Sequence, residues 1–200
     1  ALEPESQNCE AILQAWYPGQ AGGQAVAEVL FGDYNPAGKL PLTFYRNLAQ
    51  IPDFEDYNMT GRTYRYMKET PLFPFGHGLS YTTFKYGKLK MNDDKIAAGQ
   101  NLNLVIPVTN TGSRDGDEVV QVYLKKMDDT EGPVKTLRAF KRVRIPAGKT
   151  VEVKFSLNDT QLEWWDEQSN TMRVCPGNYT VMIGGTSCEK SLLSRTFTIR

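Results

Sequence analysis

The stretch PLFPFGHGLSYTTF, residues 71–84, decides how the rest of the chain is organised. Proline and glycine interrupt it too often for a helix, and it is too rich in aromatic side chains to be a solvated linker. Its prolines fix φ, while Gly76 and Gly78 permit turns that other residues resist. A segment of this kind is most stable when it is pressed between two bodies, so we expect an interdomain junction here.

The sequence before the junction predicts the last βα unit of an α/β domain. Residues 11–17 are apolar and end at a Pro-Gly pair, which is typical of a short buried strand or its exit loop. Apolar residues at i, i+1, i+4 and i+5 predict a helix from about Gly22 to Phe31, which Gly32 ends. Residues 39–45 are extended, and Pro41 favours an edge or irregular strand there.

After the junction the pattern is that of strands. Apolar and polar side chains alternate in segments that are separated by Gly, Pro or Asn, and this indicates a two-sheet antiparallel sandwich. A part of about 110 residues can bury a core without metal or cross-links. The expected strands cover residues 86–91, 102–108, 119–124, 137–145, 151–157, 163–166, 179–183 and 197–199.

The composition is that of an ordinary globular chain of one or two domains. The 200 residues carry 23 acidic and 23 basic side chains, so no net field attracts nucleic acid or an anionic membrane surface. No apolar run approaches the roughly 20 residues of a membrane span, and residues 1–13 lack the features of a secretory signal. We therefore expect neither a nucleic acid nor a membrane as partner.

Residues 47–67 carry the most suggestive chemistry. Acidic, aromatic and basic side chains follow one another without a period, as in a structured loop, and such loops concentrate binding groups. A sugar site needs aromatic faces for the pyranose ring and charged groups for its hydroxyls. The side chains that could supply both are Tyr57, Arg62, Tyr64, Arg65 and Tyr66, of which Tyr57, Arg62 and Tyr64 are the candidate substrate-binding residues. The alternative is a clamp, in which the two arginines pair with Asp53, Glu55 or Asp56 and hold the domains together.

Two further features have a structural and a functional interpretation. Trp164 and Trp165 are adjacent in an expected strand, so one should enter the core and the other face outward. The outward ring is either a carbohydrate platform or a contact with the α/β body. His77 is the only histidine, and without a neighbouring nucleophile or second metal ligand we expect it to be structural.

The cysteines do not indicate a metal site. Cys9, Cys175 and Cys188 lack the paired spacing of zinc ligands, so no metal or cofactor is expected. One interpretation of the odd number of cysteines is that all three are buried, unpaired thiols. A disulfide between Cys175 and Cys188, which flank an expected hairpin strand, is the other.

Four segments resemble glycoside hydrolase family 3: PLFPFGHGLSYTTF (71–84), AWYPGQAGGQAVAEVLFGDYNPAGKLPLTFY (15–45), VTNTGSRDGDEVVQVYL (108–124) and GNYTVMIGG (177–185). The resemblance implies an α+β fragment. Residues 1–50 would be the terminal βα unit of an α/β sandwich domain, residues 51–84 a loop and interdomain junction, and residues 85–200 an all-β fibronectin type III-like (immunoglobulin-like) sandwich.

The resemblance also implies a function for the parent protein. Family members are exo-acting retaining glycosidases whose nucleophile is an aspartate on a barrel domain and whose acid/base is a glutamate in an EGxDR motif. This chain contains neither motif, so we expect no catalytic residue in it and assign it a structural, pocket-supporting role. DFEDYNMTGRTYRYM (residues 53–67) resembles the β-xylosidase branch more than the β-glucosidase branch.

The resemblance implies two partners: an oligosaccharide that the complete enzyme binds, and the remaining α/β and barrel domains. Whether the enzyme forms a homodimer is left open. The parent enzyme would be secreted or periplasmic, with its signal outside these residues. Two alternatives remain. The chain could be a free-standing module that binds carbohydrate or protein without catalysis, or Glu55 or Asp56 could be the proton donor of an active enzyme.

Overall fold

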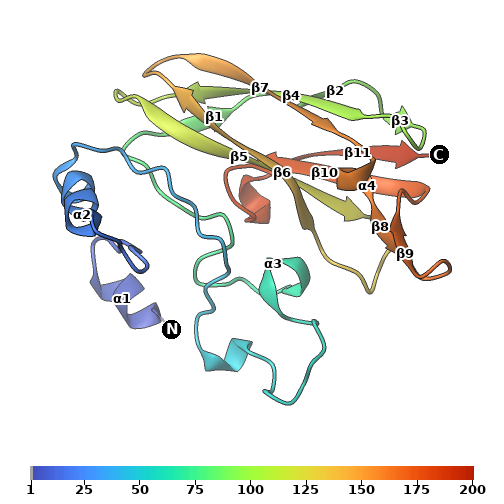
Figure 1. Cartoon of the computed structure of the whole chain (residues 1–200), viewed down its shortest axis with the longest axis horizontal. Helices are drawn as coiled ribbons and strands as arrows, with labels where there is room; N and C mark the ends of the chain where they lie inside the picture. Colours follow the sequence, from blue (N-terminus) through green and yellow to red (C-terminus); the bar gives the residue numbers. More distant parts are fainter. Residues whose placement is uncertain (1) are drawn as a thin grey trace.

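The N-terminal part of the chain is an arm of short helices and loops beside a β-sandwich (Figure 1). The computed structural model describes residues 2–200. The predicted helix is confirmed as α2, and it ends where Gly32 adopts the left-handed conformation at φ 83°. The helices of this arm, residues 2–70, are α1 (Glu3–Asn8), α2 (Gly22–Phe31), the 3₁₀ helix η1 (Leu48–Gln50) and α3 (Thr63–Tyr66).

Residues 11–17, for which the sequence allowed a short buried strand or its exit loop, do not form the strand. These residues are irregular and exposed, because no strand among residues 2–200 lies beside them to complete a hydrogen-bonded ladder. Residues 39–45 are extended as predicted, but their only bridge to another segment in the described part of the chain joins Phe44 to Phe73 in the junction.

None of the helices within residues 2–200 is long and apolar enough to span a membrane.

The first sheet of the sandwich is centred on β4. β4 and β7 pair along their whole lengths, from Leu102 opposite Leu157 to Thr109 opposite Thr150. Two short strands, β1 and β2, pair with the other edge of β4. The bounds of this sheet are β1 (Phe84–Tyr86), β2 (Lys90–Met91), β4 (Leu102–Asn110) and β7 (Thr150–Leu157).

The second sheet has the order β3-β11-β10-β5-β6 and faces the first. All its pairs are antiparallel except β11 with β3, and the β5–β6 register shifts at Val122/Tyr123. Its strands are β3 (Lys95–Ile96), β5 (Gly116–Lys126), β6 (Thr136–Ile145), β10 (Gly177–Gly184) and β11 (Leu193–Ile199). α4 (Asp159–Leu162) follows β7, and the 3₁₀ helix η2 (Glu189–Ser191) precedes β11.

Two predicted strands are formed differently from the prediction. The strand expected at residues 86–91 is divided into β1 and β2 at Gly87, whose amide donates to the Pro107 carbonyl and whose Cα lies so close to Pro107 that a Cβ would clash. The segment around residues 163–166 is a strand, β8 (Trp164–Asp166), but it pairs only with β9 (Thr171–Arg173), in a separate hairpin.

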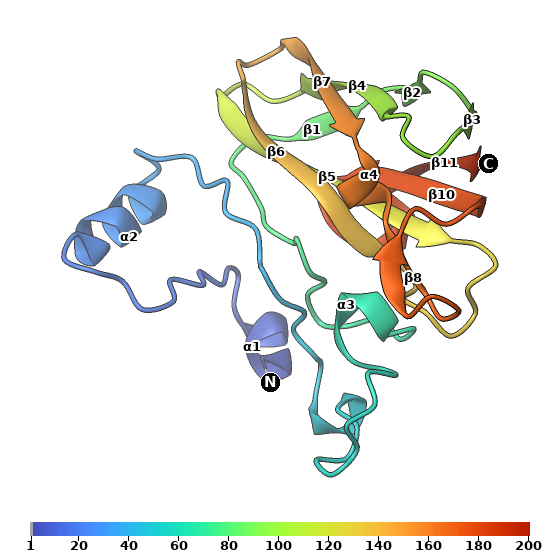
Figure 2. The same cartoon turned by 45° about the vertical axis from the view of Figure 1, so that its right-hand side comes forward.

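The hydrophobic core lies almost entirely between the two sheets. It contains the inward side chains of β4, β5, β7, β10 and β11, together with Trp164 and Leu162. Upstream of residue 84, Ala37 is the one buried hydrophobic residue that the structure describes. Figure 2 shows the consequence: the helices α1 and α2 stand outside the sandwich, whereas the junction segment (residues 71–84) and α3 approach it. Residues 32–39, which follow α2, also bond to the sandwich. The arm therefore has no core of its own.

Candidate functional site

The loop of residues 47–67 is held together by Arg62, which bonds to backbone oxygens. Its guanidinium donates to the carbonyl of Asn58 at 3.0 Å, to that of Asp53 at 3.1 Å and to that of Asp56. The ion pairs predicted for Arg62 and Arg65 with nearby carboxylates are absent from the described residues. Arg62 thus rigidifies its own loop and does not clamp two domains.

The loop turns sharply at Thr63. Its φ of 56° is unusual for a β-branched residue, and such a backbone persists only where its surroundings hold it. Here the Thr63 amide donates to the Tyr45 hydroxyl at 2.9 Å, and the Thr63 hydroxyl accepts from the Arg65 amide at 3.2 Å. The strained turn begins α3 and separates two of the candidate residues, because Tyr57 stays in the exposed loop while Tyr64 enters the junction.

Tyr64 joins the arm to the sandwich. Its ring stacks on Phe75 at 4.3 Å and meets the Tyr123 ring edge-on at 5.9 Å. Its hydroxyl accepts a hydrogen bond from the Leu137 amide at 3.1 Å. Of the three candidate substrate-binding residues, Tyr64 is thus engaged by the sandwich, Arg62 by its own loop, and only Tyr57 has a side chain directed to solvent. The structure does not bring the three together in one pocket.

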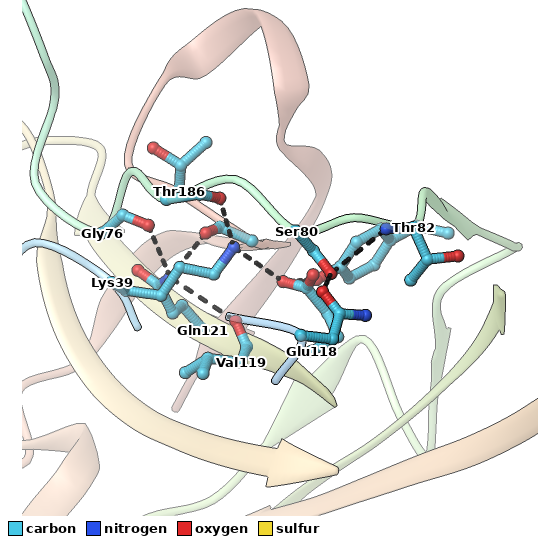
Figure 3. Close-up of polar contacts among 12 residues, drawn as sticks. Lys39, Gly76, Ser80, Thr82, Glu118, Val119, Gln121 and Thr186 are labelled. Carbon is cyan, nitrogen blue, oxygen red and sulfur yellow. Dashed lines mark hydrogen bonds and ion pairs between the residues drawn. The ribbon is translucent and has the colours of Figure 1, made fainter. Parts of the chain in front are cut away.

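The junction is fixed to the second sheet by backbone groups. The Phe75 carbonyl accepts from the Ser187 amide at 2.9 Å, and the Gln121 side chain donates to the carbonyls of Gly76 and Gly185 (Figure 3). Gly76 has φ 78°, and a Cβ there would lie 2.1 Å from Gln121 Oε1. Only glycine therefore permits this close approach.

An ion pair crosses the junction from the arm to β5. Lys39 Nζ lies 3.4 Å from Glu118 Oε1 and donates to the Gly78 carbonyl at 3.0 Å, and Glu118 also accepts from the Tyr86 hydroxyl at 3.2 Å (Figure 3). Burial raises the pKa of Glu118 despite the opposing effects of Lys39 and Tyr86. Burial, together with the Glu118 charge, raises the pKa of Tyr86 far above its usual range. The cluster is therefore a desolvated contact between the two parts.

A second polar contact surrounds Asn110, which is fully buried at the end of β4. Its amide nitrogen donates to the carbonyls of Arg114 at 2.7 Å and Ile145 at 2.9 Å, and its amide oxygen accepts from the Thr82 hydroxyl at 2.6 Å and the Gly112 amide at 3.0 Å. One asparagine thus satisfies four groups and ties the junction to the turn of residues 110–116.

Asn35 makes a similar connection from the arm. Its side-chain oxygen accepts from the Ser80 hydroxyl and the Tyr81 amide, each at 2.8 Å, and its nitrogen donates to the Asp115 carbonyl at 2.9 Å. The Tyr81 hydroxyl donates to the Val29 carbonyl of α2 at 2.6 Å. Sequence reasoning missed these asparagines, and the only available signal was their position in turn-like Asn-Pro and Asn-Thr-Gly segments.

His77 is structural in these surroundings. Its ring stacks on Phe73 with centroids 5.3 Å apart, and its carbonyl accepts from the Leu40 amide at 2.8 Å. Burial and the nearby Lys39 charge lower the pKa of His77, so the neutral ring is favoured. These packing and backbone contacts agree with the structural role that the sequence predicts.

The carboxylates of the loop are exposed. Hydrogen bonds from Asn58, with a smaller contribution from Arg62, hold the pKa of Asp56 below its ordinary value. A general acid requires a raised pKa, so this environment disfavours Asp56 as the proton donor. Within residues 2–200 no cluster of three His, Cys, Asp or Glu side chains could hold a metal ion.

The two adjacent tryptophans are divided between core and surface, as predicted. Trp164 is buried, and its indole N–H donates to Asp129 Oδ2 at 2.5 Å, whereas Trp165 is exposed. The buried thiol of Cys175 lies 3.8 Å from the Trp164 carbonyl, and all three cysteines are free. Cys9 is exposed, so the prediction of three buried thiols holds for Cys175 alone, and the alternative Cys175–Cys188 disulfide is not formed.

These features define a class of architecture: the end of an α/β domain fastened by a buried polar junction to a fibronectin type III-like sandwich. Comparison with known families agrees with it. Residues 1–81 match the Glycosyl hydrolase family 3 C-terminal domain, and residues 118–187 match the Fibronectin type III-like domain. The chain belongs to glycoside hydrolase family 3, and it contains that family's C-terminal domain segment and fibronectin-like domain.

Similar proteins are much longer than this chain. It is 53% identical over 199 residues to a xylan 1,4-beta-xylosidase from Xylanibacter ruminicola, with 100% of this chain and 23% of that protein covered. It is 39% identical to a periplasmic beta-glucosidase from Salmonella typhimurium, with coverages of 94% and 26%. The structure of a β-glucosidase from Erythrobacter marinus matches with a TM-score of 0.84 and 39% identity, over 98% of this chain and 26% of that one. The chain thus spans about a quarter of these relatives.

Proposed function

We propose that this chain is part of an exo-acting retaining glycosidase that releases terminal β-linked xylose or glucose from plant-derived oligosaccharides, with xylose preferred. The observation that carries the proposal is the 53% identity, over the whole chain, to a protein named as a xylan 1,4-beta-xylosidase. In this reaction one carboxylate attacks the anomeric carbon while a second, about 5 to 5.5 Å away, protonates the leaving oxygen. Both groups would lie outside these residues.

The role that we assign to this part is to complete the α/β domain and to brace it. Large apolar side chains of the arm stand exposed, among them Tyr17, Leu30 and Phe31. A patch of this kind marks a contact surface. We propose that the rest of the α/β domain covers it, and that the junction then transmits the rigidity of the sandwich to the completed domain.

Of the candidate residues, we propose Tyr57 alone for direct contact with the substrate. This ring is 90% exposed on a loop that Arg62 and Thr63 hold in place, so it is free to stack on a sugar. We assign Arg62 and Tyr64 to positioning this loop, with direct substrate contact as the alternative for both.

The test uses the full-length protein and two aryl glycosides, a β-xyloside and a β-glucoside. The proposal expects hydrolysis of both, with the larger kcat/KM on the xyloside. Tyr57→Ala should raise KM several-fold, because it removes a stacking face. Phe54→Ala is the matched control, since Phe54 is 91% exposed on the same loop. No hydrolysis of either glycoside would overturn the proposal, and equal effects of the two variants would remove Tyr57 from the site.

Deletion of residues 61–67 tests the whole loop. It should impair both stability and hydrolysis in the full-length protein, because it removes the strained turn and Tyr64 together. Unchanged rates and stability would contradict both the bracing and the pocket role. The alternative of a free-standing binding module predicts a native protein of about the 22.5 kDa of this chain that retains polysaccharide and hydrolyses nothing.

We also propose that the parent enzyme is exported. The observation behind this is the name of the Salmonella typhimurium relative, a periplasmic beta-glucosidase. Cell fractionation with an antibody against residues 89–200 tests it. A signal confined to the cytoplasmic fraction would contradict export.

A further inference from the structure

A cleft of about 630 Å³ lies where α3 meets the sandwich, and Tyr57 is not among the residues that line it. Its walls come from α3, from the turn between β5 and β6, and from the β8–β9 hairpin, which lie next to one another in Figure 2. A volume of this size falls within the range of small-molecule sites, about 300 to 1,000 Å³. None of the three candidate substrate-binding residues lines it.

One wall of the cleft is aromatic. Trp165 is 51% exposed there, because strand alternation directs the adjacent Trp164 into the core and leaves Trp165 on the outer face of β8. The inner ring is fixed by the hydrogen bond from its indole N–H to Asp129. The Tyr66 ring lies on the opposite element, α3. The outer indole is thus an exposed flat surface beside a fixed inner ring.

Two arginines, Arg65 and Arg138, are among the residues that line the cleft. The Nε atoms of Arg65 and Arg138 are buried and lack a partner within residues 2–200. Arg138 is held in place, since it donates to the Glu163 carbonyl at 2.7 Å and lies 5.3 Å from the Trp164 ring centre. The nearby Arg65 charge, together with burial, lowers the pKa of Arg138. Because the protein covers both Nε atoms, they are not available to a ligand in the cleft.

The charges that line the cleft exclude an anionic ligand. Three basic residues face five acidic ones, so the wall has an excess of negative charge. Three acidic groups have internal partners: Asp128 pairs with Lys126 at 3.3 Å, Asp166 pairs with Arg173 at 2.7 Å, and Asp129 accepts from the Trp164 indole. A wall with both donors and acceptors suits hydroxyl groups, because each hydroxyl donates and accepts. A flat aromatic face beside them suits a pyranose ring.

We propose that this cleft is an accessory, non-catalytic site for a neutral β-linked oligosaccharide, with one sugar ring stacked on Trp165. Carboxylates at the rim would accept from the sugar hydroxyls, and guanidinium N–H groups of the lining arginines other than the covered Nε atoms would donate to them. The site adds a substrate-retaining function to the sandwich. Binding at this site requires no carboxylate pair. The accessory-site proposal can therefore be tested independently of the proposed hydrolysis.

The experiment is affinity electrophoresis of the full-length protein in gels that contain a neutral xylan, a glucuronate-bearing xylan, or no polysaccharide. Trp165→Ala should weaken retention by the neutral xylan about tenfold, as expected when a central aromatic contact is truncated. Trp165→Phe keeps an aromatic face and should restore part of the retention. Phe140→Ala is the matched control, because Phe140 is 65% exposed on β6 and lies outside the cleft.

Two further readouts separate the possible outcomes. Intrinsic fluorescence should change when xylohexaose is added to the wild-type protein, and this change should be lost in Trp165→Ala. Aryl glycoside hydrolysis reports on the proposed function independently, and all three variants should retain it. Equal retention of Trp165→Ala and wild type would overturn the proposal, as would equal losses in Phe140→Ala. Stronger retention by the glucuronate-bearing polymer would overturn the assignment to a neutral ligand.

Discussion

Lys39 and Glu118 form an ion pair, 79 positions apart in sequence and 3.4 Å apart in space, with only 16% and 7% of their side chains exposed. Two charges removed from water in this way are tolerated because each has a second partner, the Gly78 carbonyl for Lys39 and the Tyr86 hydroxyl for Glu118. The pair therefore makes the attachment of the arm to the sandwich specific. Removal of one member should destabilise the protein, because the other charge would be buried without a partner.

Lys39→Met should destabilise the protein by about 3 kcal/mol, because it leaves the Glu118 carboxylate buried without its counter-ion. Urea denaturation of the full-length protein measures the loss. The double variant Lys39→Met/Glu118→Gln should recover part of it. Lys85→Met, at an exposed lysine of β1, is the control and should change stability by less than about 0.5 kcal/mol. An equal loss at both lysines would show that the buried pair has no special role.

The raised pKa of Glu118 predicts a pH dependence of stability with a definite sign. Above the ordinary glutamate pKa of about 4.3, the folded protein keeps a proton that the unfolded chain has lost. The free energy of unfolding should therefore fall as pH rises through this window, by at most about 1.4 kcal/mol per pH unit for one proton. Glu118→Gln should remove this component when unfolding is measured from pH 4 to 8.

His77 should change the pH dependence of the free energy of unfolding in the opposite direction to Glu118. Its lowered pKa means that the unfolded chain binds a proton first, so its contribution to stability is present above about pH 6.5 and is lost as pH falls below that value. Comparison of wild type with His77→Gln over the same pH range isolates this effect. A stability difference that stays constant across pH 6.5 would contradict the assignment.

Gly76→Ala should cost about 3 kcal/mol. It forces a side chain to adopt φ 78° and displaces Gln121, whose hydrogen bonds to Gly76 and Gly185 would be lost. Gly99→Ala is a close control, since Gly99 has φ 83° but open space around it, and it should cost only the backbone strain of about 1 kcal/mol. Equal losses would mean that the contact with Gln121 contributes nothing.

Asn110→Ala should be among the most damaging single changes, because it leaves four buried or partly buried polar groups without their partner. We expect a loss of about 3 kcal/mol or more in the free energy of unfolding. Asn103→Ala, at an exposed position of the same strand, should be nearly neutral. Similar thermal midpoints for the two variants would rule out the proposed role of Asn110.

Much of the fold follows from local patterns. The apolar spacing and Gly32 predict α2 with its observed ends, and strict alternation predicts β4 and β7, because a sheet with one buried face imposes a period of two. The division of residues 86–91 at Gly87 could not be predicted, since it depends on Pro107 of the neighbouring strand. The short strand that was one of the two interpretations of residues 11–17 is not formed, because strand formation requires a partner as well as a pattern.

The candidate site was harder to predict for the same reason. Arg62 was identified as important, but its acceptors are carbonyl groups, which every residue carries and which no sequence pattern distinguishes. Lys39 and Glu118 have the side chains of ordinary solvated residues, and only their separation in space makes them a buried pair. Strand alternation alone predicted that one of Trp164 and Trp165 faces outward, and the structure shows that it is Trp165.

The confinement of the core to the sandwich has a consequence for synthesis. The ribosome releases the arm first. The carbonyl of Phe75 accepts a hydrogen bond from Thr186, which is synthesised 111 residues later. Until β10 has left the exit tunnel, the exposed apolar side chains of the arm have no folded neighbour within this chain. These side chains stay exposed in the folded chain as well, and the junction closes late in the life of the nascent chain.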